Sequence, residues 1–229
     1  MLAESGQRSG EPRRTRNQRL GKPPTDTRDH GYTQRLTTLQ GARWKRWLDV
    51  QAPYRRHLRG LDLGFILDVG CGIGRTLAHC GGDGVGIDHN PTSLELARAQ
   101  GFEAYDVDEF WRTSHAEGES FDSLLFSHVL EHVEFDDAVA LVAKYAPLLR
   151  ANGRVVCLCP QESGFRSDPT HVTFCDFDAL RGVADGAGLA VEQTYSFPFP
   201  RVFGRLFRHN EFVLIARKPA QGEGLPVGA

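Results

Sequence analysis

The chain has 229 residues, of which 40% are hydrophobic and 24% charged, a composition typical of a soluble globular protein large enough to bury a core. Its formal net charge of −2 excludes the strongly basic surface by which many proteins attract nucleic acid or anionic lipid. The sequence has neither an apolar leader nor an apolar run of about 18 residues, so we expect a cytoplasmic protein without a membrane span. The five cysteines include no Cys-x-x-Cys pair and are predicted to be reduced and mostly buried.

Composition divides the chain into three parts. Residues 1–30 hold seven Arg or Lys against four acids and few apolar side chains, which predicts a disordered basic arm. Such an arm can contact an anionic partner, although a solvated tail is the simpler interpretation. The central domain is expected to span residues 31–218, and residues 219–229 to form a flexible tail.

The first half of the central domain alternates helical and strand patterns. Asn90 and Pro91 have the residue types of a helix start, and Gly101 has that of a helix end. The apolar runs between the helices are short and several end in glycine or aspartate, as buried parallel strands do. In chain order the expected elements are helix 34–58, strand 64–70, strand 84–88, helix 90–101, strand 102–106 and strand 121–127.

The second half continues the alternation. Asn152 and Gly153 predict a turn between a helix and a strand. The last strand can run antiparallel to its neighbours. In chain order we expect helix 134–149, strand 154–159, helix 176–187, strand 190–197 and strand 211–218. Strands that alternate with helices in this way predict a doubly wound α/β sheet.

Three glycines stand where the strand at 64–70 turns into the next helix. Gly70, Gly72 and Gly74 allow the backbone to approach a ligand closely, and the N-terminus of a helix offers unpaired N–H groups. A dinucleotide-binding turn is the obvious rival, but its Gly-x-Gly-x-x-Gly pattern would place the third glycine where this chain has Arg75. Alone, the turn is also compatible with a purely structural role.

Two acids follow the next two predicted strands. Asp88 ends the strand at 84–88, where a carboxylate can accept hydrogen bonds from both hydroxyls of a ribose. Asp106 ends the strand at 102–106, where it can accept from an exocyclic amine. The alternative for Asp106, and also for Asp68 in the glycine segment, is a purely structural role in capping the strand ends.

The segment LDVGCGIG at 67–74, the two acids and the segment FDSLLFSHVLEH at 121–132 together resemble the class I S-adenosylmethionine (SAM) dependent methyltransferases. The resemblance covers nearly all of residues 60–218. It implies a Rossmann-like α/β fold with a seven-stranded, mostly parallel sheet and an antiparallel strand near the edge. The residues that it implies for cofactor binding are Asp68, Gly70, Gly72, Gly74, Asp88, His89, Asp106, Val107, Ser127 and His128.

HVLEH at 128–132 matches the His-x-x-Glu-His zinc signature of the inverzincin peptidases. A peptidase needs that motif inside a long helix, whereas here it begins directly after a buried strand, at the edge where α/β sheets bind ligands. If the chain turns helical at residue 128, then His128, Glu131 and His132 share one face. Asp168 and His171, in DPTHVTF, follow the next strand and are further candidates.

This constellation resembles metal-dependent O-methyltransferases, namely those of the terminal ribose of small RNAs and those of ubiquinone synthesis, whose E-x-x-E-H segment holds a divalent ion. By that resemblance His128, Glu131, His132 and His171 would bind Mg²⁺ or Mn²⁺, with Asp168 as a further carboxylate. The chain departs from the pattern at His128, which stands in place of Glu and makes the site softer than magnesium prefers. Without a metal, His132 or His171 is the expected general base, or the acid and histidines merely shape the pocket wall.

The acceptor is constrained less well. SHVLEH lacks the [DNS]-P-P-[YF] pattern of base-methylating enzymes, and the acidic body argues against nucleic acid. We expect a hydroxyl of a vicinal diol on a small molecule or oligosaccharide, with a phenol or catechol as the alternative. The chain also resembles the methyltransferases of methylmannose polysaccharide synthesis, which implies a mannoside-type sugar as the acceptor. Outside this class stand an NAD-dependent oxidoreductase and a SAM-binding module without catalysis. Aromatic residues crowd the segment before the last strand and predict a substrate lid, a homodimer contact or core packing: Phe197, Phe199, Phe203, Phe207 and Phe212.

Overall fold

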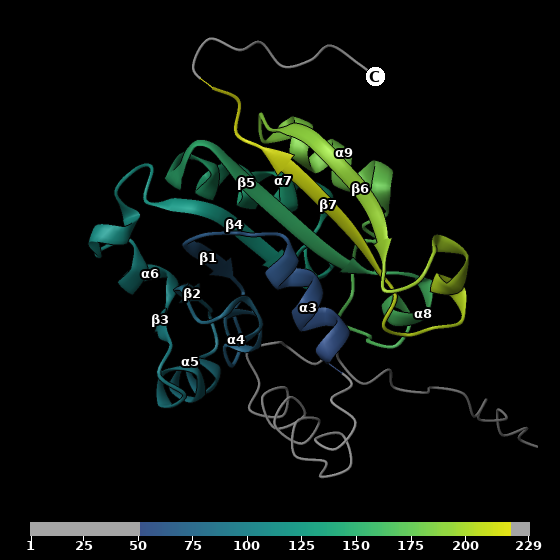
Figure 1. Cartoon of the computed structure of the whole chain (residues 1–229), viewed down its shortest axis with the longest axis horizontal. Coiled ribbons are helices and arrows are strands. Elements are labelled where there is room, and N and C mark those ends of the chain that lie inside the picture. The colour runs from purple at the N-terminus through teal and green to yellow at the C-terminus, as the bar shows by residue number, and fades with distance from the viewer. Residues whose placement is uncertain (1–50, 221–229) are drawn as a thin grey trace, which may run out of the picture.

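The computed structural model describes residues 51–220, in which a central sheet carries helices on both faces (Figure 1). The predicted arm at 1–30, the 34–50 part of the first predicted helix and residues 221–229 of the predicted tail lie outside the described residues. Within that range, no helix is both long and apolar enough to cross a membrane.

The sheet has seven strands in the order β3-β2-β1-β4-β5-β7-β6. All pairs from β3 to β5 are parallel, whereas β7 is antiparallel to both β5 and β6. The predicted α/β sheet, mostly parallel with one antiparallel strand near the edge, is therefore confirmed. The strands are β1 (Ile66–Val69), β2 (Gly84–Ile87), β3 (Glu103–Tyr105), β4 (Phe121–Ser127), β5 (Leu149–Pro160), β6 (Ala190–Phe197) and β7 (Glu211–Arg217).

Alternate side chains of each strand feed two separate cores. On one face, strand residues such as Leu67 and Phe126 pack against α7 and α9. On the other face, residues such as Ile66 and Val213 pack against α3, α4 and α5. The helices are α3 (Ala52–Gly60), α4 (Arg75–Cys80), α5 (Pro91–Ala99), α6 (Val107–Phe110), α7 (Phe135–Tyr145), α8 (Glu162–Phe165) and α9 (Phe177–Gly186), with short 3₁₀ turns η1 (Ser114–Ala116), η2 (Leu130–His132), η3 (Ala146–Leu148) and η4 (Arg201–Arg205).

The predicted limits of α5 are correct and follow from its capping. The Asn90 side chain accepts a hydrogen bond from the backbone N–H of Ser93 at 3.1 Å, and Pro91 occupies the first turn. Gly101 follows the helix with a φ of +89°, which glycine adopts without a Cβ penalty. The helix therefore starts and ends where its residue types predict.

Two predicted boundaries on the β4 to β5 side are wrong. The α7 helix ends at Tyr145 rather than 149, because Pro147 has no N–H to continue it and the chain tightens into η3. Asn152 and Gly153 form no separate turn but lie inside β5, which starts at Leu149. Asn152 takes a φ of +62° there, and the pairing with β4 is irregular, so the surplus residues form a bulge.

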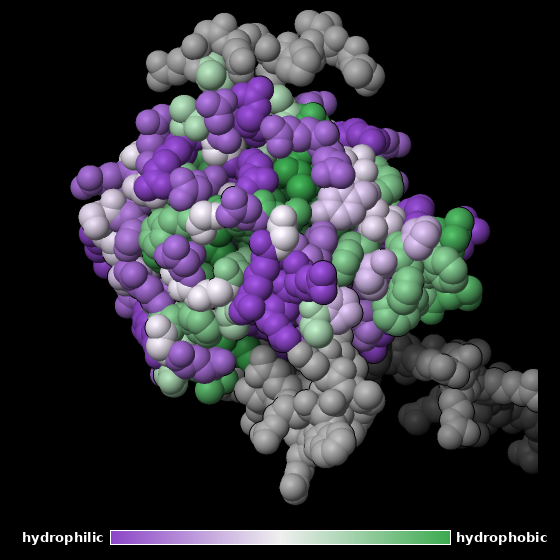
Figure 2. Space-filling view, in the orientation of Figure 1, coloured by the Kyte–Doolittle hydropathy of each residue, from purple (hydrophilic) through white to green (hydrophobic). Residues whose placement is uncertain are grey.

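The aromatic segment between β6 and β7 is split between the core and the surface. Phe212 is fully buried and contacts Phe177 with ring centroids 4.8 Å apart. By contrast, the side chains of the connecting segment are exposed, up to 83% at Leu206, and Figure 2 shows apolar surface at this end of the molecule. Core packing thus explains Phe212, while a lid or dimer role for Phe199, Phe203 and Phe207 stays a prediction.

Candidate functional site

The turn between β1 and α4 depends on its glycines. Gly70, Gly72 and Gly74 have φ values of +81°, +54° and +80°, which L side chains rarely adopt. A Cβ at Gly70 would collide with the Cγ2 atom of Val129. The predicted turn is therefore present, and its backbone conformation favours glycine over any larger residue. It lies next to the segment that follows β4.

Substitution of Gly70 by alanine is expected to lower the free energy of unfolding by roughly 2 kcal/mol or more, because it combines a positive φ with a steric clash. It is also expected to weaken binding of S-adenosylhomocysteine (SAH). Thermal unfolding with and without SAH measures both effects. Gly60→Ala is the control, since Gly60 ends α3 and a Cβ there meets nothing within 4 Å; equal effects of the two substitutions would contradict the special role of Gly70.

Asp88 ties the glycine turn to the start of α5. Its Oδ2 accepts from the backbone N–H of Gly72 at 2.8 Å, and its Oδ1 accepts from that of Asn90 at 2.8 Å. Each carboxylate oxygen can accept a further hydrogen bond, so the two ribose hydroxyls expected here remain compatible with this geometry. His89, predicted beside it, has a side chain that is 45% exposed, with Nδ1 3.9 Å from Asp88 Oδ1.

Asp106 acts as a helix cap. Its Oδ1 accepts from the backbone N–H of Glu109 at 2.8 Å, while Glu109 Oε2 accepts from the backbone N–H of Asp106 at 3.1 Å. This capping box is the structural role that the sequence left open as the alternative. Val107 follows as the first residue of α6 and is half-buried. An adenine contact for this pair stays a prediction.

Asp68 is not a cap, and its environment is unusual. It lies within β1, is fully buried, and neither carboxylate oxygen has a hydrogen-bond partner among residues 51–220. Burial, together with the negative charge of Asp88, raises the pKa of Asp68 to about 8. SAM carries a sulfonium and an ammonium group, so a buried carboxyl without a partner beside a glycine turn fits the cofactor that the resemblance implies.

The HVLEH segment is not helical at its first residue. The backbone N–H of His128 still donates to Leu158 O of β5 at 2.9 Å, and His128 then takes a φ of +58°. The 3₁₀ turn η2 begins only at Leu130, whose fully buried side chain anchors the segment in the core. The chain does not turn helical at residue 128, so the condition under which His128, Glu131 and His132 would share one helical face is not met.

The ring of His128 lies between two carboxylates. Its Nδ1 is 3.2 Å from Glu131 Oε1, and its Nε2 is 2.8 Å from Glu211 Oε1. Burial lowers the pKa of His128, but the charges and hydrogen bonds of Glu211 and Glu131 outweigh it and raise the pKa to about 10. Both ring nitrogens face carboxylates, and His128 is not among the residues whose ligand atoms converge, so this geometry does not support His128 as a ligand.

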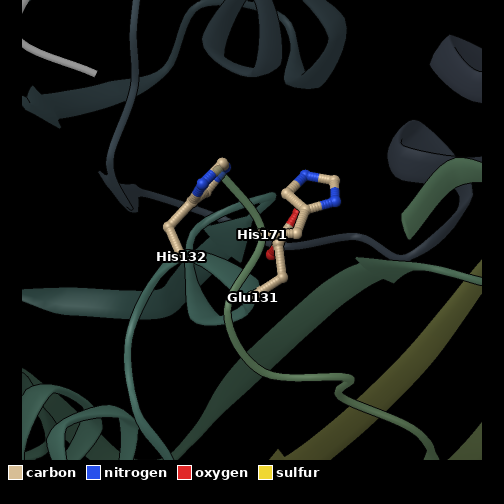
Figure 3. Close-up of side chains that lie close together, drawn as sticks. All are labelled: Glu131, His132 and His171. Carbon is tan, nitrogen blue, oxygen red and sulfur yellow. The ribbon is translucent and has the colours of Figure 1, made fainter. Parts of the chain in front are cut away.

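The other three predicted ligands do come together. Ligand atoms of Glu131, His132 and His171 all lie within 4.8 Å of one another, and the Glu131 carboxylate lies between the two rings (Figure 3). Glu131 is fully buried, and its Oε2 has no hydrogen-bond partner in the described part of the chain. Burial raises the pKa of Glu131, but the hydrogen bond and the charge of His128 outweigh it and lower the pKa, which favours the carboxylate form.

Backbone carbonyls orient the two imidazoles of this cluster. His132 Nδ1 is 3.2 Å from Thr170 O, and His171 Nδ1 is 2.8 Å from Phe165 O. A ring whose Nδ1–H donates to a carbonyl keeps its Nε2 lone pair free to bind a cation, as metal-binding histidines commonly do. Burial, with a smaller contribution from the neighbouring His171, lowers the pKa of His132 despite Glu131. One carboxylate and two imidazoles form a donor set that fits a divalent ion.

Asp168 does not join this cluster. Its Oδ1 accepts from the backbone N–H of Thr170 at 2.9 Å and from the Thr170 hydroxyl at 2.7 Å. It thereby fixes the loop that carries the carbonyl partner of His132. The expectation that Asp168 supplies a second carboxylate ligand is not supported.

Two residues at the site were missed by the sequence. Glu211, the partner of His128, begins β7 and is 83 residues away in the chain. Tyr54 of α3 lies with its hydroxyl 3.1 Å from the hydroxyl of Ser127, the predicted cofactor residue at the end of β4. Neither lies in a recognisable motif, so only the strand order and the position of α3 could have revealed them.

Residues 67–157 match the family described as a methyltransferase domain. No curated protein matches the chain. Among solved structures, a SAM-dependent methyltransferase from Archaeoglobus fulgidus is 17% identical, with a TM-score of 0.61 over 83% of this chain and 100% of that chain. Magnesium protoporphyrin IX methyltransferase from Synechocystis PCC 6803, solved with bound SAH, is 15% identical, with a TM-score of 0.58 over 84% and 96%.

A third similar structure is the complex between the Haloferax volcanii Trm112 methyltransferase activator and the putative methyltransferase. It is 16% identical to this chain, with a TM-score of 0.63 over 85% of this chain and 97% of that one. At these identities the solved structures show the fold. Residues 67–157 are thus similar to a methyltransferase domain, and the described chain has the fold of these solved structures.

Proposed function

We propose that this protein is a SAM-dependent O-methyltransferase that methylates one hydroxyl of a vicinal diol, on a sugar or glycan of the mannoside type, with a divalent cation at Glu131, His132 and His171. The observation that carries the proposal is the convergence of these three side chains within 4.8 Å at the carboxyl edge of the sheet. Parallel α/β sheets bind their ligands at this edge.

Different residues of the chain would bind the cofactor and the metal ion. Asp68 and the glycine turn would receive the cationic end of the cofactor, and Asp88 its ribose. Glu131 and the two imidazoles would hold the ion at the end of β4 and in the loop after β5. When bound, a divalent cation would orient an acceptor hydroxyl and lower its pKa. Methyl transfer from a sulfonium is a displacement, so positioning of that oxygen is the main task of the protein.

The diol follows from the donor count. Three protein ligands leave coordination positions open on a cation such as Mn²⁺, and two neighbouring hydroxyls can fill two of them. Sugars offer such pairs, and so do catechols, which remain the alternative acceptor class. The described body carries no excess of cations that would favour RNA over a free sugar, and nucleic acid stays disfavoured.

A metal-free mechanism is the second candidate, and one observation favours it. The lowered pKa of His132 keeps its imidazole neutral at pH 7, so its free Nε2 could accept the proton of a phenol or catechol directly. In this case Glu131 would orient the histidine. A single acidic hydroxyl would then suffice.

The test is transfer of labelled methyl groups from SAM to a panel of acceptors. The panel contains methyl α-mannoside, a mannose oligosaccharide and catechol, each paired with an analogue in which one of the neighbouring hydroxyls is removed or methylated. We expect transfer to the intact diols only, with added Mn²⁺ and not with a chelator. Equal transfer to the single hydroxyls, or transfer that survives the chelator, would favour the metal-free candidate.

The same assay separates the functions outside this class. A SAM-binding module without catalysis would bind SAM yet leave the label on it with every acceptor. An NAD-dependent oxidoreductase would bind NAD in preference to SAH. Arg75 follows Gly74 where a dinucleotide turn has its third glycine, and this argues against that function.

A further inference from the structure

The connection between β6 and β7, residues 198–210, exposes a cluster of apolar side chains. Five of the eight large apolar side chains that are exposed among residues 51–220 belong to it. Val202 and Leu206 are the most exposed of them, at 74% and 83%. Figure 2 shows apolar surface at this end of the molecule. Clustered apolar side chains on a surface mark a site of interaction more often than chance.

The connection is held firmly on the body of the protein. Gly204 in η4 is buried against Gln161, and a Cβ at this position would collide with the side chain of Gln161. The side-chain amide of Asn210 donates to Gln161 Oε1 at 2.9 Å, and its Oδ1 accepts from the backbone N–H of Phe199 at 2.9 Å. The ring centroids of Phe199 and Phe207 lie 5.1 Å apart. A fixed support therefore presents the exposed side chains.

Cations accompany these apolar side chains. Residues 198–210 contain Arg201, Arg205 and Arg208 and neither Asp nor Glu. Arg201 forms an ion pair with Glu162 of α8 at 2.7 Å, whereas Arg205 lies 3.9 Å from the same carboxylate, and the side chains of Arg205 and Arg208 are exposed. One acid against three arginines leaves a surplus of two positive charges. The net charge of −2 for the whole chain therefore coexists with a cationic, apolar surface at one end.

Charge distinguishes between the possible occupants of this surface. Residues 1–50 hold eleven Arg or Lys against five acids, so the preceding part of the chain has the same sign of charge as the surface. A second copy in a symmetric contact would bring the same arginines together, and like charges across an interface are unfavourable. Both observations favour an anionic partner.

Among anionic partners, the exposure of the apolar side chains favours a lipid surface. Val202 and Leu206 stand out from the protein instead of lining a groove. A protein partner would need a complementary shape, and nucleic acid would leave aliphatic side chains in water. The boundary between headgroups and acyl chains accepts apolar side chains of any shape, while anionic headgroups attract arginine.

We propose that the connection at 198–210 docks on an anionic lipid surface, with Val202 and Leu206 below the headgroups and Arg205 and Arg208 among the lipid phosphates. Such docking is peripheral and needs no membrane-spanning helix. The inference goes beyond the proposed function and holds for any acceptor. Because the connection contacts α8, whose Phe165 carbonyl accepts from His171, the docked protein would hold the metal cluster near the bilayer.

The test is cosedimentation of the full chain with vesicles of phosphatidylcholine, alone or mixed with phosphatidylglycerol, at low and high salt. Wild type should bind the anionic vesicles only, and less at high salt, because salt screens surface charges. Val202→Ser combined with Leu206→Ser should weaken binding about tenfold or more, since two apolar side chains no longer insert. Arg205→Gln combined with Arg208→Gln should also weaken it about tenfold or more, at about fivefold per cation.

Arg112→Gln combined with Lys144→Gln is the matched control. It removes the same number of exposed cations beside α6, at the opposite edge of the sheet, where Lys144 lies 5.3 Å from the ring of Trp111 (Figure 1). Its vesicle binding should equal that of wild type. An equal loss in the control would reduce the effect to overall charge and overturn the inference.

Three further outcomes would overturn the inference. Wild type could fail to bind anionic vesicles, or its binding could survive in both variants of the connection, which would place the contact elsewhere in the chain. Size-exclusion chromatography tests the third: a dimer that Val202→Ser with Leu206→Ser dissolves, without vesicle binding, would assign the surface to a second copy. All variants alter exposed side chains, so their melting temperatures should match wild type. Vesicle binding involves no methyl transfer, so its failure would leave the proposed function untouched.

Discussion

Replacement of Asp68 by asparagine is expected to stabilise the protein without cofactor and, at the same time, to weaken its binding of SAM at least about tenfold. The pKa of Asp68 is raised to about 8 by burial and by Asp88, whereas an unfolded chain ionises an aspartate near pH 4. As the pH rises, Asp68 therefore loses its proton in the unfolded state before it does so in the folded state. Stability of the wild type is lost as the pH rises from about 4 toward 8.

Thermal unfolding of the cofactor-free protein between pH 5 and 8 measures this effect. Asp68→Asn should unfold at a higher temperature than wild type at pH 8, by roughly 2–4 kcal/mol in stability, and the difference should shrink toward pH 5. Asp83→Asn, which removes an exposed carboxylate before β2, is the matched control. A stability difference between Asp68→Asn and wild type that does not depend on pH would show that folding does not raise the pKa of Asp68.

The second large effect concerns the metal cluster. Titration of Mn²⁺ into protein loaded with SAH is expected to show one ion per chain, with Mn²⁺ bound more tightly than Mg²⁺ because two of the three ligands are imidazoles. Glu131→Ala and His171→Ala should each weaken binding at least about a hundredfold, since even partners outside the coordination sphere are worth about 10–100-fold. Calorimetry measures the stoichiometry and the affinity directly.

Glu134→Ala is the control for this titration, because Glu134 is an exposed acid three residues after Glu131 and makes no capping hydrogen bond. Its ion binding should equal that of wild type. Absence of binding in the wild type would remove the metal from the proposal and leave His132 as the general base. Binding that survives in both cluster variants would place the ion elsewhere.

The positions of the strands along the chain could be predicted because most strands are short apolar runs with a distinct boundary residue. The run at 121–127 coincides with β4, and the acids at 68, 88 and 106 lie at or near the carboxyl ends of β1, β2 and β3 as expected. These features are local in sequence, and burial of both faces of the sheet makes them unambiguous.

Other features depend on contacts that no local pattern encodes. His128 was predicted as a metal ligand because its neighbours Glu131 and His132 are credible ligands. The structure adds a partner that this pattern could not reveal, Glu211, which the antiparallel strand β7 brings from 83 residues away. Likewise, Asn152 and Gly153 have the residue types of a turn, but pairing with β4 draws them into β5 as a bulge. In both cases tertiary pairing overrode a local preference.

The reversed direction of β7 places the whole connection from β6 at the same edge of the sheet as the glycine turn. This connection contacts α8 through the ion pair of Arg201 with Glu162, at 2.7 Å, and α8 ends at Phe165, whose carbonyl accepts from His171. The connection between residues 198 and 210 is thus linked through α8 to His171, whereas the glycine turn is built on β1 and α4. A change in this connection is therefore expected to reach one imidazole of the cluster and to leave the glycine turn in place.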